Sequence, residues 1–553
     1  MEEALFMGIR LKLGVLSAVL IAVVLAGCGK KPVSAPKQTV LTRMESDNIP
    51  TMDPARATDA ISSQAMANVY AGLYRYDGKT LTGDMATGRA RVSNHHHTYT
   101  FTLRKNARWS DGKQVTAEDF VYAWQRVVDP ATKSEYAYLF SGFKNADAIM
   151  RGEKAPNRLG VTAVNKTTLK VELSRTIPYF EPLLTLKTFY PVEKKQVLKY
   201  GDKFGTSGHT LTFNGPFTMS GWREAAGSWT QKKNARYWNA KNVHLTAIKN
   251  RVVKDSATAL QLFDAGKLDD VVVTGDTAKQ LQNRSVFNVV PQNATFYIEM
   301  NGKRVPAFAN RDVRRALSMA INRKQFVQQV LGDGSQPATT VIPAGMMYSG
   351  TNGADFATEA GAKVAKYAKY DLPAARKLLA KGMQQVGTKE LKFTLVSDDT
   401  DGAKNTLSYL QAAFGKLSTG GYKVTVNTKS VPFKTRLALS TSHDVDMVVS
   451  AWGANYPDPS SFLDLFTAQN QYNTGLWHNT EYNQLVKKAE GVDAASPTKR
   501  WADMQRATAV LSSEVGVISF YQRGAAHLTN AQVHGMQLSP NGLISFDQVR
   551  IGK

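Results

Sequence analysis

VDMVVSAWGANYPDPSSFLDLF, residues 445–466, contains the clearest structural signal in this sequence. It opens on an apolar run at 447–452, broken only by one serine, which is typical of a strand buried on both faces. The run ends at Gly453, and two prolines in the following loop bias the residues before them toward extended backbone. Open α/β sheets bind ligands at the carboxyl ends of such strands. The side chains delivered there are Trp452, Asn455 and Asp458.

The composition indicates a soluble globular protein of two or more domains. The chain has 553 residues, too many for one hydrophobic core, and 43% are hydrophobic against 21% charged. Its single cysteine excludes an intramolecular disulfide framework. The net charge of +24 indicates either solubility in a basic secreted protein or attraction to an anionic surface such as phospholipid head groups. No nucleic-acid partner is expected, because the basic residues are spread along the chain without a nucleic-acid-binding motif.

The amino terminus has the pattern of a secretory signal. Two basic residues, Arg10 and Lys12, precede an apolar run at 13–25, which is too short for a transmembrane helix of about 20 residues. The run ends in Leu-Ala-Gly-Cys and resembles the bacterial lipobox, whose cysteine thiol receives a diacylglycerol. We therefore predict a signal peptide over 1–27, lipidation of Cys28, with palmitate among its acyl chains, and a tether over 28–38. The alternative is an ordinary signal peptide with a chance cysteine.

Strands and helices alternate through the rest of the chain, which favours an α/β protein over an all-helical or all-β one. Apolar spacing predicts strands at 39–44, 99–103, 169–173, 393–396, 424–426 and 517–521, and helices at 60–73, 120–128, 405–417 and 501–511. Thr116 and Asp119 fit a capping box at the start of one helix, and Asp312 is predicted to cap another.

The motifs of common enzymes and cofactor sites do not occur in this sequence. It has no P-loop, no dinucleotide fingerprint, no HExxH, no GxSxG and no CxxC. Three consecutive histidines, His95 to His97, would alternate between the faces of a strand, so we expect a solvated turn and not a metal site. The sequence therefore predicts a protein that is not an enzyme and that binds no cofactor or metal.

A more specific signal lies at 101–130, FTLRKNARWSDGKQVTAEDFVYAWQRVVDP. This segment resembles the signature region of the peptide-binding family of extracytoplasmic solute-binding proteins, the oligopeptide- and dipeptide-binding receptors of ABC importers. Further blocks resemble the family in the same order, at 51–54, 176–180, 214–217, 234–238, 308–323 and 445–466. The resemblance covers about residues 39–550.

The resemblance implies a two-lobed periplasmic-binding-protein-like α/β fold with an extra domain inserted in the first lobe. Lobe 1 would comprise 39–73, 212–300 and 521–553, the inserted domain 74–211, and lobe 2 301–520. The chain would cross between the lobes near Asn301 and near Tyr521. A ligand would lie between the lobes, which close over it by a hinge.

The resemblance also implies the binding residues. An early and a late loop would pair with the peptide backbone as strand edges do, whatever the peptide sequence. The predicted residues are Glu45, Ser46, Asp47, Asn48, Ile49, Trp452, Gly453, Ala454, Asn455, Asp458 and Tyr521. Trp452 and Tyr521 would either form aromatic walls of the ligand cleft or pack in the core. In the family a late-loop aspartate binds the peptide's α-ammonium. Asn455 stands at that position here, so we expect weakened recognition of a free amine, with Asp458 either substituting for it or shaping the loop.

The predicted function is a lipid-anchored receptor on the outer face of the cytoplasmic membrane of a Gram-positive bacterium. As a monomer it would capture oligopeptides and deliver them to the permease and ATPase subunits of an ABC importer. A receptor for signalling peptides such as pheromones, a cell-surface chaperone or adhesin, and a secreted hydrolase are the alternatives.

Overall fold

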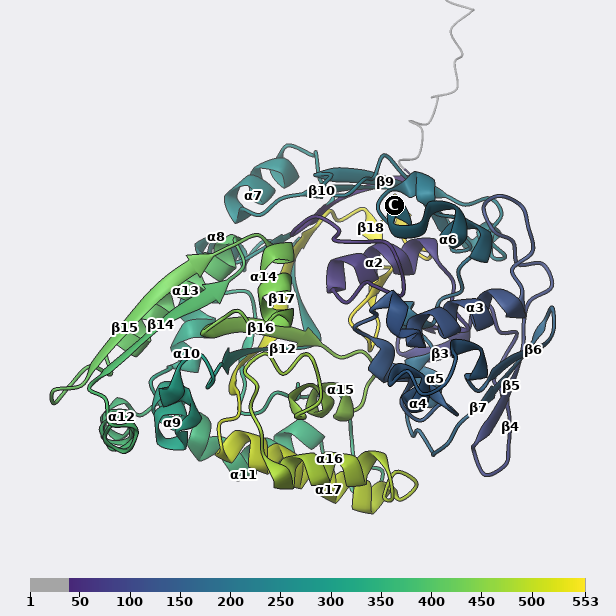
Figure 1. Ribbon diagram of the computed structural model, residues 1–553. Coiled ribbons are helices and arrows are strands. Elements are labelled where there is room, and N and C mark those ends of the chain that lie inside the picture. Colours follow the sequence, from purple (N-terminus) through teal and green to yellow (C-terminus); the bar gives the residue numbers. More distant parts are fainter. Residues whose placement is uncertain (1–38, 553) are drawn as a thin grey trace, which may run out of the picture. The chain divides into compact units, whose positions relative to one another are not determined.

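The computed structural model describes residues 39–552, which form a mixed α/β arrangement (Figure 1). The predicted signal peptide, Cys28 and the tether lie outside the described residues. Within 39–552, no helix has the length and apolar character needed to cross a membrane.

A mixed sheet of 11 strands runs through the structure, in the order β15-β14-β16-β12-β17-β11-β1-β10-β9-β8, with β13 beside β17. In that order the strands are β15 (Lys423–Ser430), β14 (Glu390–Ser397), β16 (Met447–Gly453), β12 (Phe287–Met300), β17 (Ile518–Thr529), β11 (Asp270–Val273), β1 (Val40–Glu45), β10 (Ala247–Val252), β9 (Ser228–Lys233), β8 (Phe217–Ser220) and β13 (Gln336–Pro337). The strand predicted from the opening stretch is thus β16.

Two long antiparallel strands, β12 and β17, connect the halves of this sheet. The first part of β12, 287–291, pairs with 524–528, which β11 joins on its other side. The second part pairs with β16 over 294–300 and with 518–522 over 295–298. The register shifts between Pro291 and Thr295, where the ladder is interrupted. The predicted crossing point near Tyr521 lies on β17, and the one near Asn301 lies directly after β12. The exact lobe boundaries stay a prediction.

Two large hydrophobic clusters hold helices against the sheet. One hydrophobic cluster joins β1 and β10 to α2 (Ala60–Val69) and to the segment 74–211. Another joins the ends of β12 and β17 to β14, β16 and the helices α9 (Arg311–Met319), α12 (Leu372–Val386) and α13 (Asp401–Gly415). The remaining longer helices are α6 (Lys194–Tyr200), α7 (Ser256–Asp264), α8 (Gly275–Leu281), α11 (Phe356–Ala368), α14 (Phe433–Thr441), α16 (Thr480–Glu490) and α17 (Pro497–Ser513).

The segment 74–211 forms small sheets of its own. These are β2 (Tyr74–Asp77) with β3 (Thr80–Gly83), and β4 (Arg91–Ser93), β5 (Thr98–Thr102), β7 (Thr168–Glu172) and β6 (Val161–Asn165). Its helix α3 (Ala117–Val128) begins with the predicted capping box, in which Asp119 accepts the Thr116 backbone N–H at 2.8 Å. The three histidines lie in an exposed turn between β4 and β5, and no group of three or more metal-ligating side chains occurs in residues 39–552.

Two predictions of helix ends were wrong, because a neighbouring residue caps one helix and a distant side chain holds the backbone extended after the other. Asp312 does not cap α9; Asn310 does, with Oδ1 accepting the backbone N–H of Asp312 at 2.9 Å. The helix predicted at 60–73 ends at Val69. Beyond it, the Asn214 side chain bonds both backbone groups of Ala71, at 3.0 and 2.9 Å, and holds the chain in an extended conformation.

Candidate functional site

One edge of β16 is open where the sequence predicts the ligand. β12 pairs with β16 along its whole length, from Met447 to Gly453. On the other side β14 pairs only with Met447 and Val448. Residues 449–453 therefore present an edge that no described strand occupies, which we call the open edge of β16.

The backbone groups of this edge point away from β12. The Ala454 N–H donates to the Asn293 carbonyl at 2.7 Å, so Ala454 faces β12, as does Trp452 two residues earlier. Because neighbouring residues of a strand alternate, the N–H and C=O groups of Ala451 and Gly453 face the open edge. Both residues are exposed. Their spacing, roughly 7 Å, is the repeat at which an added extended chain forms hydrogen bonds.

The early loop follows β1, and most of its predicted ligand side chains are already engaged. Glu45 forms an ion pair with Arg43, and Ile49 is buried in the first hydrophobic cluster. Asp47 accepts the Asn48 backbone N–H at 2.7 Å and pairs with a lysine. Ser46 is exposed and Asn48 half-buried, so these two remain accessible to a ligand.

Lys254 connects the early loop to the other half of the sheet. Its Nζ lies 2.9 Å from Asp47 Oδ2 and 2.7 Å from Asp399 Oδ1, just after β14. A second contact supports it, because Asp401 Oδ2 accepts the Ser256 backbone N–H at 3.0 Å. The two predicted lobes therefore touch beside the early loop.

An aromatic wall follows the open edge. The Trp452 ring centroid lies 6.1 Å from that of Tyr136 and 4.8 Å from that of Tyr472. The Tyr136 hydroxyl lies 3.0 Å from the Thr58 carbonyl and 3.5 Å from Asn455 Oδ1. Trp452 Nε1 and Asn455 Nδ2 are both buried without a hydrogen-bond partner in the described chain. The late loop thus offers donors that nothing in 39–552 satisfies.

By contrast, both carboxylate oxygens of Asp458 already accept hydrogen bonds from the chain. Arg500 donates to both of its carboxylate oxygens, at 2.7 and 2.8 Å, and Ser460 donates its backbone N–H and hydroxyl to Oδ1 at 2.9 and 2.7 Å. Burial would raise the pKa of Asp458, but Arg500 and these bonds hold it below its usual value. The structure therefore gives no support to a ligand-binding role for Asp458, whose carboxylate holds the loop in shape.

Tyr521 lies in core packing. Its ring stacks on Phe296, with centroids 4.5 Å apart and planes 9° from parallel, and Phe326 lies 5.5 Å away. It is buried in the second hydrophobic cluster. Of the two roles predicted for Tyr521, core packing is the one that these contacts support.

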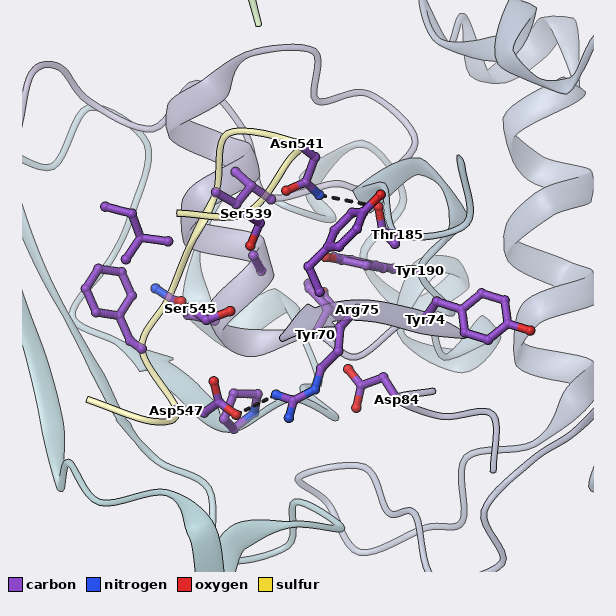
Figure 2. A pocket seen from close by; sticks show the side chains of 18 of the residues that line it. Tyr70, Tyr74, Arg75, Asp84, Thr185, Tyr190, Ser539, Asn541, Ser545 and Asp547 are labelled. Carbon is purple, nitrogen blue, oxygen red and sulfur yellow. Dashed lines mark hydrogen bonds and ion pairs between the residues drawn. The ribbon is translucent and has the colours of Figure 1, made fainter. Parts of the chain in front are cut away.

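The pocket in Figure 2 lies elsewhere, among α2, β2 and the segment 539–547. Arg75 and Asp547 form an ion pair of 2.5 Å there, and Asn541 bonds Thr185 at 3.3 Å. Its volume is about 50 Å³. Small-molecule ligand pockets have roughly 300–1,000 Å³, so this pocket is too small for a peptide.

Comparison with known proteins identifies the family. The sequence profile of the bacterial extracellular solute-binding proteins, family 5 middle, matches residues 80–474. The chain belongs to this family. Solute-binding proteins of this family are binding proteins and not enzymes, in agreement with the sequence.

The relatives of this solute-binding protein match it over nearly its whole length. A dipeptide-binding protein of Lactococcus lactis is 35% identical over 544 residues, covering 94% of this chain and 95% of the relative. The solved structure of Listeria monocytogenes OppA bound to peptide is 34% identical, with a TM-score of 0.87, covering 93% of this chain and 99% of the other. That of the pheromone receptor PrgZ is 32% identical, with a TM-score of 0.87, covering 93% and 100%. The predicted two-lobed α/β fold is confirmed.

Sequence reasoning did not single out some residues around the candidate site of this solute-binding protein. Tyr136 and Tyr472, which flank Trp452, carry no recognisable signal because tyrosines are common on surfaces and in cores. Lys187 did carry a signal in the sequence, because it is the only charged residue in the apolar run at 183–190, LLTLKTFY. A single charge in such a run indicates a buried ion, and Lys187 is indeed only 4% exposed.

Proposed function

We propose that this solute-binding protein captures oligopeptides along the open edge of β16 and delivers them to an ABC importer. The observation that carries the proposal is the outward-facing backbone of Ala451 and Gly453. An extended peptide has a donor and an acceptor at every residue, so it pairs with such an edge whatever its side chains are. The accessible residues Ser46 and Asn48 would supply contacts from the early loop.

The proposal includes the parts that lie outside the described residues. A lipid on Cys28 would hold the receptor at the outer face of the cytoplasmic membrane, where permease and ATPase subunits would accept its peptide. Lipid chains contribute about 0.8 kcal/mol per buried CH₂ to such anchoring. The receptor would bind its peptide as a monomer.

A receptor for one signalling peptide is the second candidate. Its support is the likeness to PrgZ, which is described as a pheromone receptor. The two candidates share the cleft and differ in specificity, so a ligand screen separates them.

The experiment begins with mass spectrometry of ligands released from the purified protein by denaturation, followed by calorimetric titration of a mixed peptide library. We expect released peptides of varied sequence. One dominant sequence that binds a thousandfold more tightly than all others would favour the signalling role. Salt-sensitive binding to anionic polymers without peptide affinity would overturn peptide capture in favour of an adhesin.

A variant pair then tests the open edge itself. Gly453→Pro removes the outward N–H, and because Trp452 is already extended the proline is tolerated. Losing one hydrogen bond of about 1 kcal/mol should weaken every bound peptide roughly fivefold, independent of sequence. Gly453→Ala keeps the N–H, and its added Cβ would lie 4.0 Å from the nearest side chain, so it serves as the control. Equal affinities for the two variants would refute backbone pairing at this residue.

A further inference from the structure

One side of the sheet at β8, β9 and β10 faces outward and carries no carboxylate. Alternate residues of these strands point to opposite sides of the sheet. The set that includes Ile248, Trp229 and Phe217 packs in the first hydrophobic cluster, beside α2 (Figure 1). None of the other set is buried. We call this second set the basic face; it comprises Thr218, Ser220, Ser228, Thr230, Lys232, Ala247, Lys249 and Arg251.

The three cations of the basic face are free. The side chains of Lys232, Lys249 and Arg251 are exposed, and none has a hydrogen-bond or ion-pair partner within 39–552. Lys249 and Arg251 lie two residues apart on β10, roughly 7 Å, and Lys232 lies diagonally across from Lys249 on β9. The three side chains therefore leave the sheet within about 15 Å of one another.

The segment around these strands has the same sign of charge. Residues 225–254 contain seven lysines and arginines and neither aspartate nor glutamate. Lys241, in the connection between β9 and β10, is exposed and adds a fourth cation without a side-chain partner in the described chain. The other three bond to backbone carbonyls or to carboxylates; they are Lys233, Arg236 and Lys254.

The carboxylates that border the basic face do not balance these charges. Glu224 forms an ion pair with Lys434. Asp255 caps α7, and Asp269 is only 5% exposed and accepts a backbone N–H of β1 at 2.8 Å. Two bordering carboxylates without a cation partner thus stand against four free cations, and the surface keeps a positive charge.

We propose that the basic face docks on the anionic phospholipid head groups of the membrane. This inference rests on the proposed placement at the membrane and goes beyond it by naming the surface that meets the lipid. Phosphate-bearing head groups complement free cations that no carboxylate neutralises. The path of the chain points to the same partner, because the predicted tether, 28–38, is followed after one residue by β1, the strand beside β10. Its eleven residues span at most roughly 40 Å, so a lipid on Cys28 would hold this side of the sheet near the head groups.

Docking in this way leaves the peptide site free. In the sheet, β16 is separated from β1 by β12, β17 and β11. The open edge of β16 therefore lies away from the basic face. Substitutions on the basic face should leave peptide affinity within about twofold of the parent, because distant sites act independently.

Lysine labelling on vesicles tests the assignment without any substitution. The protein extracted from membranes, with Cys28 in its native state, is bound to vesicles of phosphatidylcholine alone or mixed with phosphatidylglycerol, and acetylation of each lysine is followed by mass spectrometry. We expect Lys232 and Lys249 to react about fivefold more slowly on the anionic vesicles, with the difference lost in high salt, which screens charges. Lys429 on β15, an exposed lysine at the other end of the sheet, should react equally on both.

A pair of double variants locates the effect. Each cation near an anionic leaflet contributes about fivefold to docking, so Lys249→Gln with Arg251→Gln should lower the docking equilibrium about thirtyfold and remove the protection of Lys232. Lys392→Gln with Lys429→Gln removes the same charge from exposed positions on β14 and β15 and should keep the protection. Protection of Lys232 that survives the first double variant contradicts the assignment.

The outcomes separate this inference from the proposed function. Association with neither kind of vesicle would overturn the placement at the membrane together with this inference, whereas association with both and equal labelling of Lys232 and Lys249 would overturn the inference alone. Protection by soluble poly(glycerol phosphate) and none by anionic vesicles would assign the basic face to a wall polymer and overturn the membrane assignment. Peptide capture is measured separately, so its failure leaves the labelling result unaffected.

Discussion

Asp458→Asn distinguishes a structural residue from a ligand residue in the late loop. The substitution keeps the side chain's shape but removes the charge that Arg500 contacts at 2.7 and 2.8 Å. Breaking a buried ion pair costs about 3–5 kcal/mol, because the remaining charge is left uncompensated. Arg500 keeps a second partner, Glu490, at 2.8 Å, so we expect the lower end, about 3 kcal/mol.

The assay is urea unfolding followed by tryptophan fluorescence at pH 7. Glu481→Gln breaks the exposed pair with Arg506 and should cost at most about 1 kcal/mol, which makes it the matched control. The folded-state pKa of Asp458 lies below its usual value, so its stabilisation is present at neutral pH and is lost as the pH falls through that folded-state pKa. The acid limb of the stability profile should therefore flatten in the variant.

Peptide affinity supplies the result that would refute this reasoning. A structural Asp458 leaves the affinity of the folded variant within about threefold of the parent, since its oxygens face Arg500 and Ser460. A tenfold loss of peptide affinity with less than 1 kcal/mol lost in stability would instead make Asp458 a ligand residue.

Three further predictions concern the cleft. Asn455→Asp should place a carboxylate beside the peptide end and raise the affinity for free-amine over N-acetylated peptides about tenfold. In the parent protein, calorimetry should give similar affinities for both kinds of peptide. Loss of binding to the parent on acetylation of the peptide contradicts this prediction. Lys254→Met removes the ion pairs that link the early loop to Asp399, and it should weaken peptide binding up to about fivefold. Small-angle scattering should then show a larger radius of gyration for the variant. An unchanged radius of gyration argues against the link. Burial lowers the pKa of Lys187 to about 8, with Asp59 opposing the shift and Tyr136 covering the ammonium. An unfolded lysine keeps its proton up to about pH 10.5, so the folded protein releases this proton first and the free energy of unfolding should rise as the pH increases from about 8 to 10.5. Urea unfolding at several pH values measures this rise, and Lys187→Met should remove it.

The sequence predicted what local patterns determine. The apolar run in the opening stretch is a strand that ends at Gly453, as expected, because burial on both faces leaves a continuous hydrophobic signature. The capping box of α3 also follows from residues three positions apart. Where a distant side chain decides, the sequence alone failed, as when Asn214 ends α2 from 143 residues away.

The candidate site shows the same division. The local apolar pattern placed Gly453 at the end of the strand and Asn455 in the loop after it, and the structure puts both there. It could not show that Arg500, 42 residues further along the chain, occupies Asp458. Nor could it show that Lys187 lies beside Tyr136, because the pairing of side chains from separate segments follows from the fold as a whole.

The continuous strands β12 and β17 have a mechanical consequence. Two hydrogen-bonded strands form a ribbon that resists stretching and shear but bends and twists more easily. Its softest point is the gap in the ladder near Pro291, which has no N–H to donate. The halves of the protein should then move with few degrees of freedom, mainly rotation about that point. The rate at which the receptor closes would depend on the bending stiffness of the ribbon, and a stiffer residue pair there would slow capture without touching the ligand.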